Sequence, residues 1–217
     1  LPARRAEVIT VISRHTKELV AQWAGVEHDK IVVIPNPLPQ GFEFQPKEEM
    51  PDVPVILTVG TKPNKNLEGI INAVVQIKCI LLIVGRMSAQ QVELLKEKAV
   101  DYENLTGATD AQIVDAYRRC DLLCFPSFFE GFGMPIIEAQ ATGRPVITSN
   151  YGAMKEVAGE GALLVDPHDV KAIHSAIQKV ITEPQTRTRL VTAGLHNVKT
   201  HDPKEIAVRY TDIYRGL

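Results

Sequence analysis

Short, continuous apolar runs alternate with helical patterns along most of this chain, and that alternation limits its fold more than any other feature. The expected strands lie at 55–59, 80–84, 104–106, 121–125, 146–149 and 162–165, and the run at 55–59 is the clearest. Runs that are apolar throughout are typical of parallel strands buried on both faces of a sheet. Strand–helix alternation at this spacing predicts an α/β fold with a doubly wound parallel sheet.

Helices are expected between and after these strands. Capping boxes start two of them, with Ser88 and Gln91 in one and Thr109 and Gln112 in the other. The expected helical ranges are 66–77, 88–100, 134–143, 152–158, 170–182, 185–198 and 203–214, with one more helix after Thr109.

The first 40 residues follow a different pattern. A strand at 8–11, a helix from the cap Ser13 to Gly25 and a strand at 31–34 precede three prolines within residues 35–39. A polar stretch then runs to Pro54, as is typical of a linker between domains.

Composition excludes several classes of function. The 217 residues are 45% hydrophobic and 23% charged with a net charge of −2, which argues against nucleic acid or an anionic membrane as the main partner. No apolar run approaches the roughly 20 residues of a membrane span. Cys120 and Cys124 have no second pair at zinc spacing, so we expect buried, reduced thiols in a cytosolic protein.

Residues 126–143 carry the strongest functional signal. Pro135 suits the first turn of a helix, and Gly131 and Gly133 leave the backbone bare just before it. Free N–H groups at a helix N-terminus bind anions, phosphate above all. Because Glu130 and Glu138 flank this site, the pattern suits a ligand with both phosphates and hydroxyls, such as a nucleotide sugar.

A second loop, residues 60–66, adds positive charge. It begins with Gly60, carries Lys62 and Lys65, and matches neither a Walker loop nor a dinucleotide fingerprint. Ligands in such sheets sit beyond the carboxyl ends of the strands, so both loops are expected to face one crevice. At roughly 4 Å and an effective dielectric of about 20, a lysine–phosphate pair gains about 4 kcal/mol before desolvation. We therefore expect lysine, and Lys65 in particular, to dominate phosphate affinity.

Each of these residues alone has an ordinary structural interpretation. Either glutamate could be a solvated carboxylate, either lysine a surface charge, and the glycines could serve only a turn. Their conjunction favours a site. The six histidines are scattered without metal spacing, there is no Asp-x-Asp pair, and no nucleophile elbow supports hydrolase chemistry.

The segment FEGFGMPIIEA at 129–139 resembles the signature of family-four (group 1) retaining glycosyltransferases of GT-B architecture. Further similarity lies in ITVISRHTKEL, VVIPNP, ILTVGTKPNKNLEGII, CDLLCFPS, TGRPVITSNYGAMKEVAGEGALLVDP and IAVRYTDIYRG. The resemblance covers essentially the whole chain and implies Rossmann-like domains, the C-terminal one for the sugar donor.

The resemblance also implies residue roles. Glu130 would meet the donor sugar, Glu138 the ribose hydroxyls, and Lys65 with the local backbone the diphosphate. The implied catalytic residues are Glu130 and Lys65, and the implied donor-binding residues are Gly60, Thr61, Lys62, Arg86, Thr109, Gly131, Phe132, Gly133, Met134, Pro135 and Glu138. It implies metal-independent transfer of a hexose from UDP-hexose or GDP-mannose to a saccharide or lipid-linked acceptor, with retention of configuration.

One departure concerns phosphate charge. Many members have an arginine directly after the strand glycine, where this chain has Thr61, and their lysine follows one position later than Lys65. Either the Thr61 hydroxyl serves the phosphate, or Lys62 supplies part of the missing charge.

Length is the larger departure. By the resemblance, residues 1–40 would be the end of an N-terminal acceptor domain, and residues 41–54 would be a linker. Residues 55–200 would form the Rossmann-like domain that binds the nucleotide sugar, and residues 201–217 a C-terminal helix. The chain begins with Leu1, so we expect a fragment or processed chain that binds donor without transferring sugar. An orphaned strand and the helix face at Leu19, Val20 and Trp23 favour self-association.

The expected location is cytoplasmic, with peripheral membrane contact through the missing domain as an alternative. Two rival functions remain at this point. One is a nucleotide-sugar epimerase of the same architecture, which would consume no acceptor. The other is a non-catalytic nucleotide-binding module, which would bind a nucleotide sugar without turnover.

Overall fold

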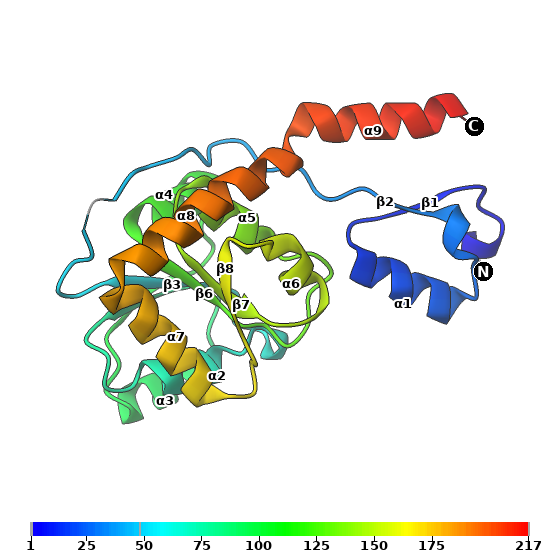
Figure 1. Ribbon diagram of the computed structural model, residues 1–217. Helices are drawn as coiled ribbons and strands as arrows, with labels where there is room; N and C mark the ends of the chain where they lie inside the picture. The colour runs from blue at the N-terminus through cyan, green and yellow to red at the C-terminus, as the bar shows by residue number, and fades with distance from the viewer. Residues whose placement is uncertain (1, 48, 217) are drawn as a thin grey trace.

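The computed structural model describes residues 2–47 and 49–216, which form two units of unequal size (Figure 1). The larger unit is built on six parallel strands in the order β5-β4-β3-β6-β7-β8. These strands are β3 Val55–Val59, β4 Ile80–Val84, β5 Tyr102–Leu105, β6 Leu122–Phe125, β7 Val146–Ser149 and β8 Ala162–Val165. The predicted α/β fold with a doubly wound parallel sheet is confirmed.

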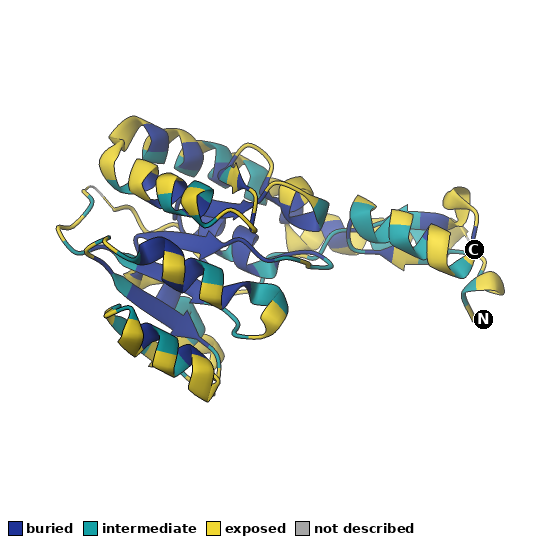
Figure 2. Ribbon diagram, turned by 90° about the horizontal axis from the view of Figure 1, so that it is seen from below, coloured by how far each residue is buried: buried dark blue, intermediate teal, exposed yellow. Residues whose placement is uncertain are grey.

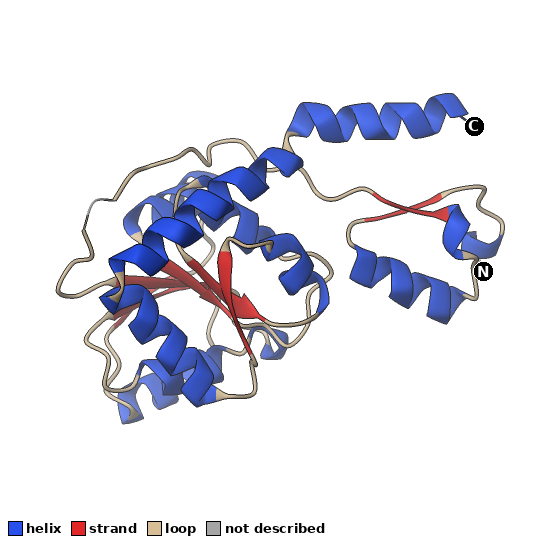
Figure 3. Ribbon diagram, in the orientation of Figure 1, coloured by secondary structure: helices blue, strands red, loops and turns tan. Residues whose placement is uncertain are grey.

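Helices cover both faces of this sheet (Figure 3). On one face lie α2 (Leu67–Val74), α3 (Ala89–Glu97) and α7 (Val170–Thr182); on the other lie α4 (Asp110–Arg119), α5 (Met134–Ala141) and α6 (Gly152–Ala158). Helix α8 (Pro184–Val198) packs against both α5 and α7. Ile56 and Leu57, neighbours in β3, belong to the two opposite cores and are fully buried, which explains why the central strands are mostly apolar. The strands of the large sheet are coloured mainly as buried in Figure 2.

The smaller unit consists of a strand–helix–strand and the last helix of the chain. Its elements are β1 (Ile9–Val11), α1 (Arg14–Ala24), β2 (Ile31–Val33) and α9 (Pro203–Gly216). Ser13 caps α1 by accepting the N–H of Thr16, and Gly25 ends the helix in a left-handed conformation, φ 61°. Four short 3₁₀ turns complete the chain at Pro2–Arg4, His28–Lys30, Pro63–Lys65 and Lys199–His201.

Two chain segments cross between the units, side by side. The first follows β2, and the second joins α8 to α9. Leu38 N donates to the carbonyl of His201 at 2.9 Å, and the His201 ring nitrogen Nδ1 lies 3.1 Å from the carbonyl of Asn36. Arg209 on α9 donates to the carbonyl of Val33 at the end of β2, 2.6 Å away. The last helix is thereby tied to the small unit.

The stretch expected as a linker is irregular chain, but it packs along the large unit. Phe42 is buried and meets Tyr117 edge-on at 5.3 Å between ring centroids. The buried guanidinium of Arg144 donates to the carbonyl of Gln45, 3.0 Å away, and Lys47 pairs with Asp121 at 2.6 Å. The proposed domain limits stay predictions, and Leu1, Glu48 and Leu217 within them lie outside the described residues.

Several boundaries differ from expectation, most by one or two residues, and the largest differences lie in α2, α3 and β5. Helix α2 ends at Val74 rather than 77, because Val75 leaves the helical conformation and Gln76 takes a left-handed φ of 72°. Helix α3 ends at Glu97, and β5 begins at Tyr102, two residues before the predicted strand.

The cysteines, Cys79, Cys120 and Cys124, are buried free thiols as expected. None of the helices in the described ranges is long and apolar enough to cross a membrane.

Asn66 joins three loops at the carboxyl end of the sheet. Its buried side chain donates to the carbonyl of Pro126 at 3.1 Å and to that of Pro167 at 2.7 Å. Its backbone takes a left-handed φ of 57°, which asparagine tolerates better than most residues. The loops after β3, β6 and β8 therefore depend on one amide.

We expect Asn66→Ala to lower the free energy of unfolding by about 2–4 kcal/mol, because two buried carbonyls lose their donor and alanine disfavours the left-handed conformation. The matched control is Asn64→Ala, which removes a single bond to the carbonyl of Phe129 from a less buried site and should cost under about 1 kcal/mol. Urea denaturation of both variants measures the difference, and equal losses would contradict this role of Asn66.

Candidate functional site

The strand order reverses between β3 and β6, and the chain leaves these two neighbours toward opposite faces of the sheet. The loop after β3 leads to α2 on one face, whereas the loop after β6 leads to α5 on the other. A crevice opens at such a switch point, beyond the carboxyl ends of the strands. Both loops singled out in the sequence border this one place.

The two loops are hydrogen-bonded to each other. Phe128 N donates to the carbonyl of Asn64 at 2.8 Å, and the Asn64 side chain donates to the carbonyl of Phe129 at 3.0 Å. Backbone contacts of this kind fix how far apart the side chains of the two loops lie. The structure thus brings the lysine loop and the glutamate loop together.

Lys65 and Glu130 form an ion pair between the two loops. The Lys65 ammonium lies 2.6 Å from Glu130 Oε1, and the side chains are only 20% and 14% exposed. The ammonium also lies 4.9 Å from the centroid of the Phe125 ring. An ammonium has three protons, so Lys65 keeps donors for a further anion while it holds Glu130.

Gly60 makes room for the Lys65 side chain. A Cβ at position 60 would lie 2.8 Å from Lys65 Cγ and 2.9 Å from its Cε, and the backbone has a φ of 95°. The lysine stem therefore lies directly across bare backbone, a path that a larger residue would obstruct.

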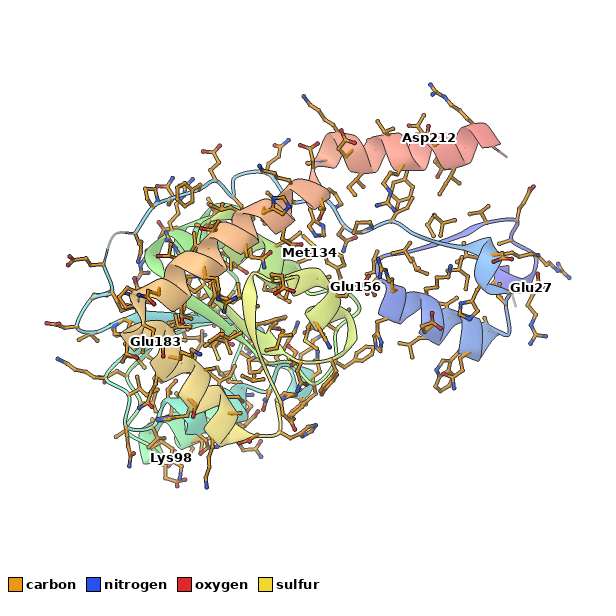
Figure 4. All side chains as sticks on the ribbon, in the orientation of Figure 1. Glu27, Lys98, Met134, Glu156, Glu183 and Asp212 are labelled. Carbon is orange, nitrogen blue, oxygen red and sulfur yellow. The ribbon has the colours of Figure 1, made fainter. Side chains whose placement is uncertain are left out.

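The N-terminus of α5 is open. Gly133 begins the helix with φ 108° and gives it no side-chain cap, while Pro135 occupies the first turn. Among the described residues, no protein acceptor receives the N–H of Phe132, Gly133 or Met134. Figure 4 labels Met134 at this end of the helix. Unpaired N–H groups here suit an anion or a hydroxyl oxygen.

Glu138, one turn along α5, is held by a residue that the sequence did not single out. The Tyr117 hydroxyl on α4 donates to Glu138 Oε2 at 2.6 Å, and Tyr117 is fully buried. Burial raises the pKa of Glu138 above its ordinary value, while the bond from Tyr117 opposes that rise. Burial and the adjacent Glu138 charge raise the pKa of Tyr117 well above its ordinary value, so the phenol keeps its proton.

The other residues expected to bind the sugar nucleotide lie at the more exposed edge of the site, which we call the rim. The Thr61 hydroxyl donates its proton to the carbonyl of Arg86 at 2.6 Å, and so joins the loops after β3 and β4. The Lys62 and Arg86 side chains are exposed. Thr109 is exposed as well, and its hydroxyl caps α4 by accepting the N–H of Gln112 at 3.3 Å.

Helix α1 of the small unit contacts the glutamate loop directly, which sequence reasoning missed. Ser13 Oγ and Thr16 Oγ1 lie 2.9 and 3.1 Å from the carbonyl oxygen of Gly131. Beside them, the carboxylate of Glu156 on α6 accepts the N–H groups of Arg14 and His15. Spacing along the chain carried no signal for this contact, because Glu156 lies 142 positions from Arg14.

No cluster of three or more His, Cys, Asp or Glu side chains that could hold a metal ion is found within residues 2–47 and 49–216. The ionisable groups in the crevice are Lys65, Glu130 and Glu138. Their arrangement offers positive charge and N–H donors for an anion, flanked by carboxylate acceptors for hydroxyls.

Curated relatives include several mannosyltransferases. The chain is 32% identical to the O-antigen chain mannosyltransferase RfbU of Salmonella typhimurium, over 87% of this chain and 55% of that protein. It is 26% identical to the serotype-specific mannosyltransferase WbdA of Escherichia coli, over 82% of this chain and 25% of that protein. The chain thus spans about half or less of the length of these two relatives.

Solved structures share the fold. The Anabaena protein HepE in complex with UDP superposes with a TM-score of 0.88 at 19% identity, covering 99% of this chain and 65% of that one. Sucrose-phosphate synthase from Thermosynechococcus elongatus gives a TM-score of 0.85 at 24% identity, covering 99% and 59%. The family described as Glycosyl transferases group 1 matches residues 40–196, well over half of the chain. The chain therefore belongs to the group 1 glycosyltransferases.

Proposed function

We propose that this chain binds a nucleotide-diphosphate hexose and supplies the donor side of a retaining hexosyltransferase. The observation that carries the proposal is the convergence, at one switch point, of the Lys65 ammonium, the open N-terminus of α5 and two carboxylates. Further support comes from the mannosyltransferase relatives and from the HepE structure with UDP-glucose. UDP-hexose and GDP-mannose are the donors to test.

The proposed division of labour follows from charge. The diphosphate leaving group gains negative charge as the glycosidic bond breaks, and preorganised donors act where that charge develops. Lys65 supplies a full charge, worth about 4 kcal/mol at roughly 4 Å and an effective dielectric of about 20. The α5 N-terminus adds about 0.3–1 kcal/mol, or about 2 when partly buried. Lys65 is thus the main diphosphate contact.

The carboxylates take the hydroxyls in this proposal. Glu138 accepts the ribose hydroxyls from a position that Tyr117 holds, and Glu130 meets the donor sugar beside the anomeric carbon. Because the Thr61 proton is engaged by the Arg86 carbonyl, Lys62 is the better candidate for additional phosphate charge. Arg86 and Thr109 border the nucleobase at the rim. The proposed acceptor is a saccharide or a lipid-linked sugar.

Ligand-induced stabilisation tests the donor class. Binding at 100 times Kd adds about 2.7 kcal/mol to the free energy of unfolding, so UDP, GDP and ADP can be ranked by thermal unfolding of the chain. We expect UDP or GDP to raise the midpoint most. Absence of stabilisation by all three nucleotides would overturn the proposed function.

Lys65→Ala should weaken binding of the preferred nucleoside diphosphate about 10- to 100-fold, since it removes the main positive charge that the proposal places against the phosphates. Lys62→Ala is the matched control, with an exposed ammonium in the same loop, and should change affinity less than about fivefold. Titration calorimetry measures both. A larger loss for Lys62→Ala would reverse the assignment.

Glu138→Ala should weaken binding of the nucleoside diphosphate about 10-fold or more, because hydrogen bonds to a charged group contribute about 1.5–3 kcal/mol. The same variant should leave inorganic pyrophosphate binding unchanged, whereas Lys65→Ala should weaken both ligands. Equal losses for both ligands in the Glu138 variant would defeat this separation of roles.

Tyr117→Phe should show a destabilisation that grows with pH. The folded-state pKa of Glu138 lies above its ordinary 4.5, so its contribution to stability is present at acid pH and is lost as pH rises through the folded value. Removing the phenol raises that pKa further and deepens the loss. We expect Tyr117→Phe to lower the free energy of unfolding by about 0.5–1.5 kcal/mol near pH 4 and by about 1.5–3 kcal/mol near pH 7, because more of the carboxyl is ionised at the higher pH.

Urea denaturation at the two pH values provides the measurement. Tyr102→Phe is the control, because that ring packs on the opposite face of the sheet from Glu138. A pH-independent difference between Tyr117→Phe and the unmodified chain would show that the phenol does not stabilise the ionised carboxylate.

A further inference from the structure

The carbonyl of Gly131 is the point at which the small unit reaches the proposed donor loop. Ser13 Oγ lies 2.9 Å from this oxygen and 2.9 Å from Thr16 Oγ1, and Thr16 Oγ1 lies 3.1 Å from the same carbonyl. Each hydroxyl has one proton. Either both protons reach the carbonyl, or Ser13 donates to Thr16 and Thr16 donates to the carbonyl; in both cases Gly131 is engaged.

These hydroxyls belong to a firmly fixed turn. Ser13 is only 1% exposed, and its Oγ also accepts the N–H of Thr16 at 3.0 Å. The Glu156 carboxylate accepts the N–H of Arg14 at 2.9 and 3.0 Å and that of His15 at 3.3 Å (Figure 4). A carboxylate at the positive end of a helix is favourable, so Glu156 holds the first turn of α1 against the large unit.

The contact of α1 with the Gly131 carbonyl also determines the direction of the next N–H group. The carbonyl of Gly131 and the N–H of Phe132 belong to one planar peptide and point in opposite directions. A carbonyl held by α1 therefore aims the Phe132 N–H away from α1. Within the described part of the chain, that N–H has no protein acceptor. Hydrogen bonds in a chain polarise one another, so an engaged carbonyl also makes its own N–H a stronger donor.

We infer that Ser13 and Thr16 are positioning residues for the donor site. They touch no ligand themselves; they orient and polarise the Gly131–Phe132 peptide, whose N–H then donates to an oxygen of the diphosphate or of its sugar. The inference rests on the proposed function and extends it, because it assigns part of the donor site to residues before the linker.

A matched pair of double variants isolates the hydroxyl from the helix cap. Ser13→Ala/Thr16→Ser and Ser13→Ala/Thr16→Val both lack the Ser13 cap, and position 16 keeps a hydroxyl in the first variant and has none in the second. The probes are UDP and GDP, each compared with its nucleoside, by titration calorimetry on the full chain. We expect the valine variant to bind the preferred diphosphate about 3- to 10-fold more weakly than the serine variant, as for one neutral hydrogen bond.

Nucleoside affinity separates positioning from a purely structural role, because a structural defect would lower the affinity for the nucleoside as well as for the diphosphate. Its affinity should be the same in the two variants, because Glu138 and the rim are unchanged. Equal diphosphate affinities would overturn the inference, and so would a parallel loss of nucleoside affinity with a lower unfolding midpoint. Failure of the unmodified chain to bind any nucleotide would instead defeat the proposed function.

Glu156→Ala provides a second variant that leaves both hydroxyls in place. It removes the acceptor for Arg14 and His15, so the first turn of α1 is no longer held against the loop. We expect Glu156→Ala to weaken binding of the diphosphate, as the valine variant does, and to leave binding of the nucleoside unchanged. Unchanged diphosphate affinity in this variant would count against the inference even where a double variant fails to fold.

Discussion

Parallel pairing of β3 with β6 is the constraint on which the site depends. These strands are neighbours in the sheet although α2, α3 and α4 separate them in sequence, and their pairing aligns Ile56 with Leu122 and Leu57 with Leu123. Although the helices that follow diverge to opposite faces, the two loops meet at the carboxyl end of the sheet, where Phe128 N donates to the carbonyl of Asn64 and Lys65 pairs with Glu130. A ligand with charge at one end and hydroxyls at the other could contact both loops at once.

Lys65, Glu130 and Glu138 each have a charged or hydrogen-bonding partner within the protein. Lys65 and Glu130 neutralise one another, and the Tyr117 phenol satisfies Glu138, so neither carboxylate is left buried without a hydrogen-bond partner. In the proposed function, the diphosphate would accept a proton of the Lys65 ammonium that Glu130 does not use. The second oxygen of Glu130 would remain free to accept a hydroxyl of the donor sugar.

Local patterns in the sequence predicted local structure well. The strands β3, β4, β7 and β8 and the capping boxes at Ser88 and Thr109 depend on residues close together in the chain, and they occur as predicted. The end of α2 was predicted wrongly, because Gln76 adopts a left-handed φ of 72° although it is neither glycine nor asparagine. Tyr117 and Glu156 were also missed: their partners lie far along the chain, so spacing alone carries no signal for them.

The contact of α1 with Gly131 implies more than a structural attachment. A coupling between two sites is reciprocal: if a docked α1 strengthens ligand binding at the loop, bound ligand must strengthen the docking of α1 by the same factor. The individual hydrogen bonds are modest, about 0.5–1.5 kcal/mol each, but they share one rigid turn and therefore act together. In the longer proteins of this family, α1 would move with whatever precedes it. Occupancy of the donor crevice would then be linked, through one peptide unit, to the position of the neighbouring domain.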